Sequence, residues 1–152
     1  VGTVKLTGTH TIPEPDLVNL AAATSLMGQT LMDPPTVESW HTGPEWIDSG
    51  TLTDRINFAV EQIGDIESAG IKDLINRIKS KGDEISPPDF VNNCLELLGH
   101  MEVDDKTKQG LMEFAEKVGG LKFTTSDQEQ ESLENIKQML QMSVSSPEYQ
   151  FA

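Results

Sequence analysis

Apolar residues recur at helical spacing along most of the chain, and no stretch alternates apolar and polar residues over the length of a strand. The clearest pattern is Ile71, Leu74, Ile75 and Ile78, which places four aliphatic side chains on one helix face. Comparable stripes occupy residues 17–31, 52–63, 90–98, 111–118 and 133–144. Because 152 residues is the length of one ordinary domain, we expect an all-α, single-domain irregular bundle of about six helices over residues 1–152.

Capping residues mark where several of these helices begin. Ser86 precedes two prolines, and a serine cap with proline in the first turn is a strong start signal. Thr51 with Asp54, and Ser126 with Glu129, have the spacing of capping boxes, so we expect helices to begin at these pairs. Residues 1–10 carry no such signal and fit either a short strand or the end of a helix.

The helix that follows Ser86 is apolar over a broad face, which is typical of a central helix. We expect Phe90, Cys94, Leu97 and Leu98 to be among the most buried residues of the bundle. Cys94 is the single cysteine of the chain, so an internal disulfide is impossible and a buried, unreactive thiol is expected.

Residues 26–47 contain more special residues than any other stretch of this length. Pro34 and Pro35 are expected to end the preceding helix, because proline disfavours a helical conformation in the residue before it. A long loop with both tryptophans of the chain follows. We expect Trp40 and Trp46 to hold this loop against neighbouring helices. The alternative is that their rings stack on a sugar.

Polar residues of the same loop supply candidate ligands. His41, Glu45 and Asp48 lie near one another in sequence but lack the spacing of a zinc site, so no metal is predicted. Arg55 follows the loop and could bind an anion through two donors, or pair with a nearby acid or a neighbouring helix. The candidate binding residues are Trp40, His41, Glu45, Trp46 and Arg55.

Catalytic signatures are missing from the sequence. It contains neither a serine in a nucleophile elbow nor a glycine-rich phosphate loop. Cys94 and His100 are expected to face different ways across a helix end, which makes them a poor nucleophile pair. We therefore predict no catalytic residue and no cofactor.

Charge restricts the possible partners. The chain has 11 basic and 25 acidic residues, which gives a net charge of -14. Such a surface repels polyanions, so we expect binding neither to nucleic acid nor to anionic membranes. The acidic residues are spread along the expected helix faces, which indicates a solvated surface.

Three passages resemble one protein family. The longest is MGQTLMDPPTVESWHTGPEWIDSGTLTDRINFA, at residues 27–59. It is similar to the signature of the bacterial family called domain of unknown function 1800, above all to members of the planctomycete type. VGTVKLTG and MLQMSVSSPEYQFA resemble the segment before that signature and the end of these proteins. His41-Thr42 departs from the proline and glycine that many members carry.

The resemblance implies that the chain is the C-terminal part of a longer, mostly helical protein. We therefore expect a non-catalytic structural or interaction region whose partner is the missing N-terminal portion of its own parent chain. Val1, Val4, Leu6 and Ile12 are expected to stay exposed and to support self-association. The alternative is part of a hydrolase-like or polysaccharide-binding protein, with the loop from Trp40 to Trp46 contributing to a site.

Overall fold

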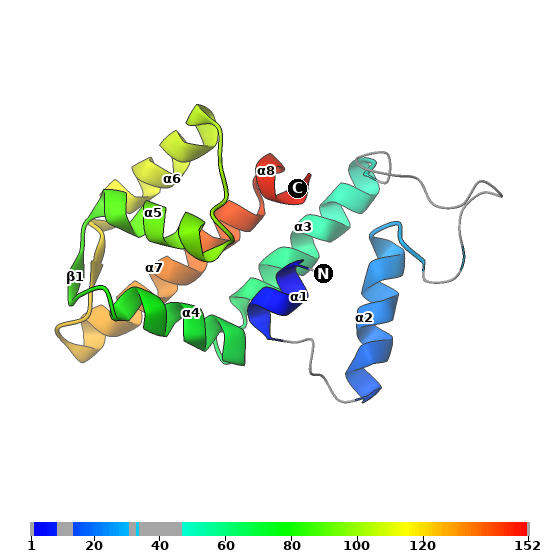
Figure 1. The fold of residues 1–152 in the computed structure, drawn as a ribbon, viewed down its shortest axis with the longest axis horizontal. Helices are drawn as coiled ribbons and strands as arrows, with labels where there is room; N and C mark the ends of the chain where they lie inside the picture. The colour runs from blue at the N-terminus through cyan, green and yellow to red at the C-terminus, as the bar shows by residue number, and fades with distance from the viewer. Residues whose placement is uncertain (1, 9–13, 31–32, 34–46, 152) are drawn as a thin grey trace.

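The structure is a computed structural model that describes residues 2–8, 14–30, 33 and 47–151, without the side chains of residues 14–17. These residues form eight helices, six of them longer than seven residues, and one pair of short strands (Figure 1). In chain order the elements are α1 (Gly2–Thr7), α2 (Glu14–Leu26), α3 (Ser49–Gly64), α4 (Ala69–Lys79), β1 (Glu84–Ile85), α5 (Pro87–Leu97), α6 (Asp105–Val118), β2 (Leu121–Lys122), α7 (Ser126–Val144) and α8 (Pro147–Gln150). The predicted all-α class is confirmed.

Helix α7 lies at the centre of this arrangement. It packs against α3, α5 and α6, and it also contacts β2 and α8. Helix α1 contacts α3 and α4, and α2 stands beside α3 on the right-hand side of the view (Figure 1). The core therefore sits between α3 and α7 and under α4, α5 and α6.

The apolar face of α7 explains its central place. Ile136, Met139, Leu140 and Val144 are fully buried. Each side chain of this size stabilises the folded state by about 1.5–3 kcal/mol when it is removed from water. Met139 follows Ile136 by three residues and lies on the same face.

Helices α4 and α5 supply the facing side of the core. The predicted stripe of α4 is confirmed, because Ile71, Leu74, Ile75 and Ile78 are all buried. Helix α5 begins as expected after Ser86, whose side chain accepts a hydrogen bond from the N–H of Asp89. The buried residues of the predicted broad face are Phe90, Val91, Cys94 and Leu95.

The prediction that Leu97 and Leu98 are among the most buried residues is wrong. Both are only partly buried. Helix α5 ends at Leu97, and Leu98 already has non-helical backbone angles. Gly99 and His100 then follow with φ angles of 100° and 57°, so the chain turns away from the core.

The end of α2 also differs from the expectation. The sequence predicted a helix as far as Pro34, but α2 ends at Leu26. Gly28 has a φ of 86°, and the N–H of Gln29 donates to the carbonyl of Thr24 at 2.9 Å. This is a glycine C-cap, which satisfies the free carbonyls of the last turn before the prolines are reached.

Helix α3 begins earlier than the predicted pair of Thr51 and Asp54. Its cap is Asp48, whose carboxylate accepts a hydrogen bond from the N–H of Thr51 at 2.8 Å. The N–H of Asp48 in turn donates to the hydroxyl of Thr51 at 2.9 Å. Thr51 is therefore the third helical residue of a reciprocal cap rather than the cap itself.

Helix α7 is capped by Thr125, not by the predicted Ser126. The hydroxyl of Thr125 accepts from the N–H of Gln128, so Ser126 is the first helical residue. Glu129 does not complete a capping box. Its carboxylate forms an ion pair with Lys79, which links the start of α7 to the end of α4.

A small strand pair was not predicted. Glu84 pairs with Lys122 and Ile85 with Leu121 in antiparallel register. Two residues are too few to produce a recognisable alternation. Gly120 precedes the second strand with a φ of 78°, and a Cβ atom there would lie 2.2 Å from the carbonyl oxygen of Ile85. The backbone of residue 120 therefore approaches β1 so closely that only glycine fits there.

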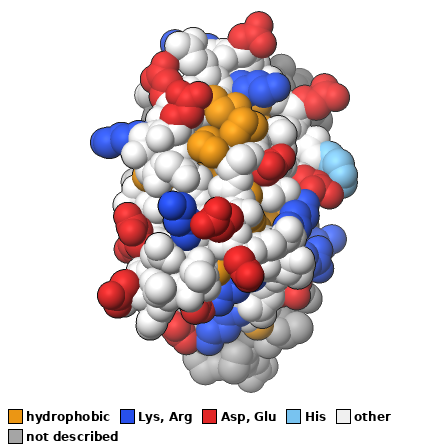
Figure 2. Space-filling model, turned by 90° about the vertical axis from the view of Figure 1, so that its left-hand side faces the viewer, with side chains coloured by type: hydrophobic (Ala, Val, Ile, Leu, Met, Phe, Trp, Pro, Cys, Tyr) orange, Lys and Arg blue, Asp and Glu red, His pale blue; other side chains and the backbone are white. Residues whose placement is uncertain are grey.

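Figure 2 shows the end of the molecule formed by the helices and strands that lie to the left in Figure 1. Acidic and basic side chains are interspersed over this face, with a small hydrophobic group among them. This agrees with the expectation that the acids are spread over the surface. None of the helices in the described part of the chain has the length and apolarity needed to cross a bilayer.

Two glycines give a matched test of the packing between α1 and α4. A Cβ atom at Gly70 would lie 2.1 Å from the carbonyl oxygen of Leu6 and 2.7 Å from the Cα of Thr7, whereas Gly110 in α6 has no atom within 4 Å. We expect Gly70→Ala to lower the free energy of unfolding by about 1–3 kcal/mol because it pushes the two backbones apart. Gly110→Ala should raise it by about 0.5–1 kcal/mol. Urea titration of both variants would measure this, and equal effects would contradict the close approach.

Candidate functional site

Four of the five predicted binding residues, Trp40, His41, Glu45 and Trp46, lie outside the described residues. Loop fixation and sugar stacking by the tryptophans therefore both stay predictions. The fifth candidate, Arg55, is described and lies on α3. It is the starting point of the candidate site.

Arg55 contacts a neighbouring helix rather than a nearby acid. Its Nη2 donates to the backbone carbonyl of Gln150 on α8 at 2.8 Å. Its Nε is buried without a hydrogen-bond partner. Among the described residues no carboxylate forms an ion pair with Arg55, and Asp48 is engaged in capping α3. The other arginine of the chain, Arg77, is paired with Asp73 at 2.9 Å.

The incomplete hydrogen bonding of Arg55 has an energetic cost. A buried donor without a partner destabilises a fold by about 1–3 kcal/mol, and more when the group is charged. Nη1 has no hydrogen-bond partner in the described part of the chain and is not among the fully buried unpaired atoms. An anion at this atom would therefore find a donor already positioned and partly desolvated.

An open cleft of about 520 Å³ lies beside Arg55. Segments far apart in sequence form its walls: α1, the end of α2, α3, the link between α5 and α6, and α8. Its apolar lining includes Met27, Phe58, Leu98 and Met101. No aspartate or glutamate lines it among the described residues, and Arg55 is the one charged residue of the described lining.

The two ends of the described chain meet at this cleft. The hydroxyls of Thr3 on α1 and Tyr149 on α8 are 2.8 Å apart and share a hydrogen bond. Both residues line the cleft. The site is therefore completed only where α1, α3 and α8 come together.

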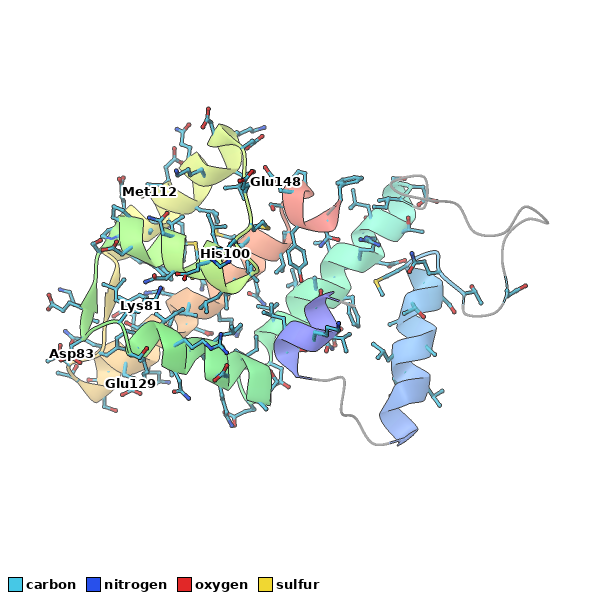
Figure 3. The ribbon with its side chains drawn as sticks, viewed as in Figure 1. Lys81, Asp83, His100, Met112, Glu129 and Glu148 are labelled. Carbon is cyan, nitrogen blue, oxygen red and sulfur yellow. The ribbon has the colours of Figure 1, made fainter. Side chains whose placement is uncertain are left out.

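Helix α8 is short but held at several points, and it is this helix that carries the partner of Arg55. The side-chain amide of Gln150 donates to the carbonyl of Val144 at 2.7 Å. Glu148 accepts from the N–H of Asp104 at 3.0 Å and from the hydroxyl of Thr107 at 3.3 Å. Figure 3 shows Glu148 on the side of α8 that faces the start of α6.

The sequence reasoning found Arg55 but missed the rest of this site. Leu98 was predicted as core, and Tyr149 was not among the candidate residues. Gly28 is the sequence feature that could have indicated the place of Met27. A glycine C-cap ends α2 just before Met27, which then lines the cleft together with residues of α3. The pairing of Thr3 with Tyr149 has no sequence signal.

Reactive chemistry is not assembled in the described residues. Cys94 is a free and fully buried thiol, and burial raises its pKa far above the ordinary value. His100 is exposed on the turn after α5. Within residues 2–8, 14–30, 33 and 47–151, no group of three or more histidine, cysteine or acidic side chains could hold a metal ion.

These features define a small helical module with a cleft whose described lining contains no acidic residue. The chain belongs to the family described as protein of unknown function (DUF1800), whose model matches residues 1–151. The family resemblance read from the sequence is thereby confirmed at the level of the family. No curated protein and no protein of solved structure matches the chain.

The burial of Cys94 leads to a direct chemical test. Because the pKa of its thiol is raised by burial, the reactive thiolate is absent at neutral pH, and reagents have no access to the side chain. We expect no reaction of the folded protein with an aromatic disulfide reagent, and one equivalent of reaction in guanidinium chloride. Rapid labelling without denaturant would show that α5 does not cover this residue.

The contacts of Glu148 predict a pH dependence of stability. The N–H of Asp104 is the largest cause that lowers the pKa of Glu148 below its ordinary value of 4.5. Its contribution to the free energy of unfolding is therefore present above pH 4.5 and is lost as the pH falls through the lower folded-state pKa. Glu148→Gln should be less stable than the parent protein at neutral pH, and the difference should shrink in acid. Glu116→Gln, at an exposed position of α6, is the control and should show no such convergence in thermal unfolding.

Proposed function

We propose that this chain is a non-catalytic helical module that forms the C-terminal part of a longer bacterial protein and docks onto the rest of that protein through α2. The observation that carries the proposal is the state of α2. None of its described side chains, from Val18 to Leu26, is buried. This stretch contains no charged residue, although the chain as a whole has a net charge of -14.

The two faces of α2 have different surroundings. Leu20, Ala23 and Thr24, at positions i, i+3 and i+4, are partly covered on the side of the bundle. Val18, Ala22 and Leu26 form a separate i, i+4, i+8 row that is exposed. Val18 is 70% and Leu26 67% exposed, the largest fractions among the exposed large apolar residues of the described chain. Such a row is the ridge that one helix presents to the groove of another.

The two described residues of the apolar surface predicted at the start of the chain, Val4 and Leu6, are not exposed. Leu6 packs against the core and Val4 is partly buried, while Val1 and Ile12 lie outside the described residues. Docking by α2 therefore replaces docking by residues 1–12 in the proposal. The resemblance of residues 139–152 to the end of family members supports the rest of the parent chain as the occupant. A second copy of this chain is the competing outcome.

The test compares removal of two exposed apolar surfaces. Val18→Ala with Leu26→Ala removes the ridge of α2, and Met142→Ala removes a 40% exposed side chain of α7. Because these side chains are exposed, neither change should destabilise the fold by more than about 0.5 kcal/mol. We expect the α2 variant alone to lose binding to the separately purified remainder of the parent chain, measured by calorimetry.

Sedimentation velocity of the isolated chain distinguishes the competing occupant. Self-association that disappears in the α2 variant, together with no binding to the remainder of the parent, would assign α2 to a second copy. If the unsubstituted chain and the α2 variant bind the remainder of the parent protein equally well, the docking role of α2 is overturned.

A further inference from the structure

We propose that the cleft beside Arg55 binds a small organic carboxylate with an apolar body. The end of α2 forms one wall of this cleft, but the ridge residues Val18 and Leu26 through which α2 is proposed to dock do not line it. Its volume of about 520 Å³ falls in the range of about 300–1,000 Å³ that small-molecule pockets occupy.

Arg55 determines which charged group the ligand must carry. One of its terminal nitrogens is held by the carbonyl of Gln150, which fixes the plane of the guanidinium, and the other has no partner in the described structure. A carboxylate at the second nitrogen would form a charge-assisted hydrogen bond and offset the charge that is now incompletely paired. A fixed guanidinium loses little side-chain freedom on binding, which favours a specific contact.

The single positive charge favours a monoanion over phosphate. Sites for phosphate usually combine several N–H donors or cations around the anion. In the described lining Arg55 is the one cation, and Thr3 and Tyr149 already share a hydrogen bond. A carboxylate carries one charge and is matched by this arrangement.

The remaining wall selects the body of the ligand. Met27, Phe58, Leu98 and Met101 present apolar surface to the cleft. Methionine side chains are flexible and polarisable, so two of them can adapt to an alkyl chain or an aromatic ring. The ligand class is therefore an alkyl or aryl monocarboxylate.

The net charge of -14 opposes an anionic ligand, but its effect at the cleft is weak. At physiological ionic strength, exposed charges beyond about 8 Å are largely screened. No carboxylate lines the cleft in the described residues, whereas Arg55 is in direct contact with it. The local attraction therefore outweighs the distant repulsion.

Titration calorimetry with octanoate tests the proposal, and the two arginines of the chain provide the matched pair. Arg55→Gln removes the cleft charge, and Arg77→Gln removes the same charge from a surface pair with Asp73. We expect octanoate to bind the unsubstituted chain and the Arg77→Gln variant equally. It should bind the Arg55→Gln variant at least about tenfold more weakly. Arg55→Lys should lie between them, and it serves if Arg55→Gln does not fold.

Two further readouts fix the ligand class and the place of binding. The methyl NMR signals of Met27 and Met101 should shift on addition of octanoate, while that of Met142 should not. Octanol should bind more weakly than octanoate because it lacks the charge, and acetate because it lacks the apolar body. The α2 variant should bind octanoate normally, so loss of docking and loss of ligand binding can be told apart.

The proposal is overturned by any of four results. Two of them concern octanoate itself: it does not bind the unsubstituted chain, or its affinity is unchanged in both Arg55 variants. The other two concern other ligands: octanol binds as tightly as octanoate, or inorganic phosphate binds more tightly than octanoate. The last result would reassign the cleft to phosphate groups.

Discussion

The fold depends on the complete burial of one face of α7. Four aliphatic side chains of this helix are removed from water, but the same face also buries Ser132 and Ser143. A buried hydroxyl is tolerated only when it is hydrogen-bonded. Ser143 donates to the carbonyl of Met139 within its own helix at 2.8 Å. Ser132 donates to the carbonyl of Lys122 at 2.7 Å and accepts from its N–H at 2.9 Å. The apolar residues thus draw the other helices toward α7, and Ser132 fixes the position of β2 on it.

Periodicity was sufficient to predict the six longer helices, since each of them repeats its signal over several turns. The four isoleucine and leucine residues of α4 are buried as expected. Helix ends were less predictable because neighbouring residues compete to form them. Thr125 and Ser126 are both good caps, and Glu129, the expected box partner of Ser126, instead pairs with Lys79 on another helix. Helix α2 ends at the C-cap formed by Gly28, which comes before Pro34 and Pro35 in the sequence.

The candidate site could be predicted only in part, for a different physical reason. Arginine in an acidic chain is conspicuous, so Arg55 was recognised from its residue type alone. Its partner is a backbone carbonyl, which every residue possesses and which therefore leaves no mark in the sequence. Whether Leu98 lies in the core or on the wall of a cleft depends on where α5 ends, and this is decided by the turn at Gly99 and His100.

The meeting of α1 with α8 has a consequence for the order of folding. The bond between Thr3 and Tyr149 spans 146 positions, and that between Arg55 and Gln150 spans 95. Closing loops of this length costs more chain entropy than forming contacts between adjacent helices. Contacts such as those of α5 with α6 can therefore form first, and these two bonds belong to the last stage. During synthesis on the ribosome, 95 further residues must be added after Arg55 before its hydrogen-bond partner Gln150 is present. The cleft is thus absent from every nascent chain that stops before Gln150, and a ligand that occupies it stabilises only the fold that includes α8.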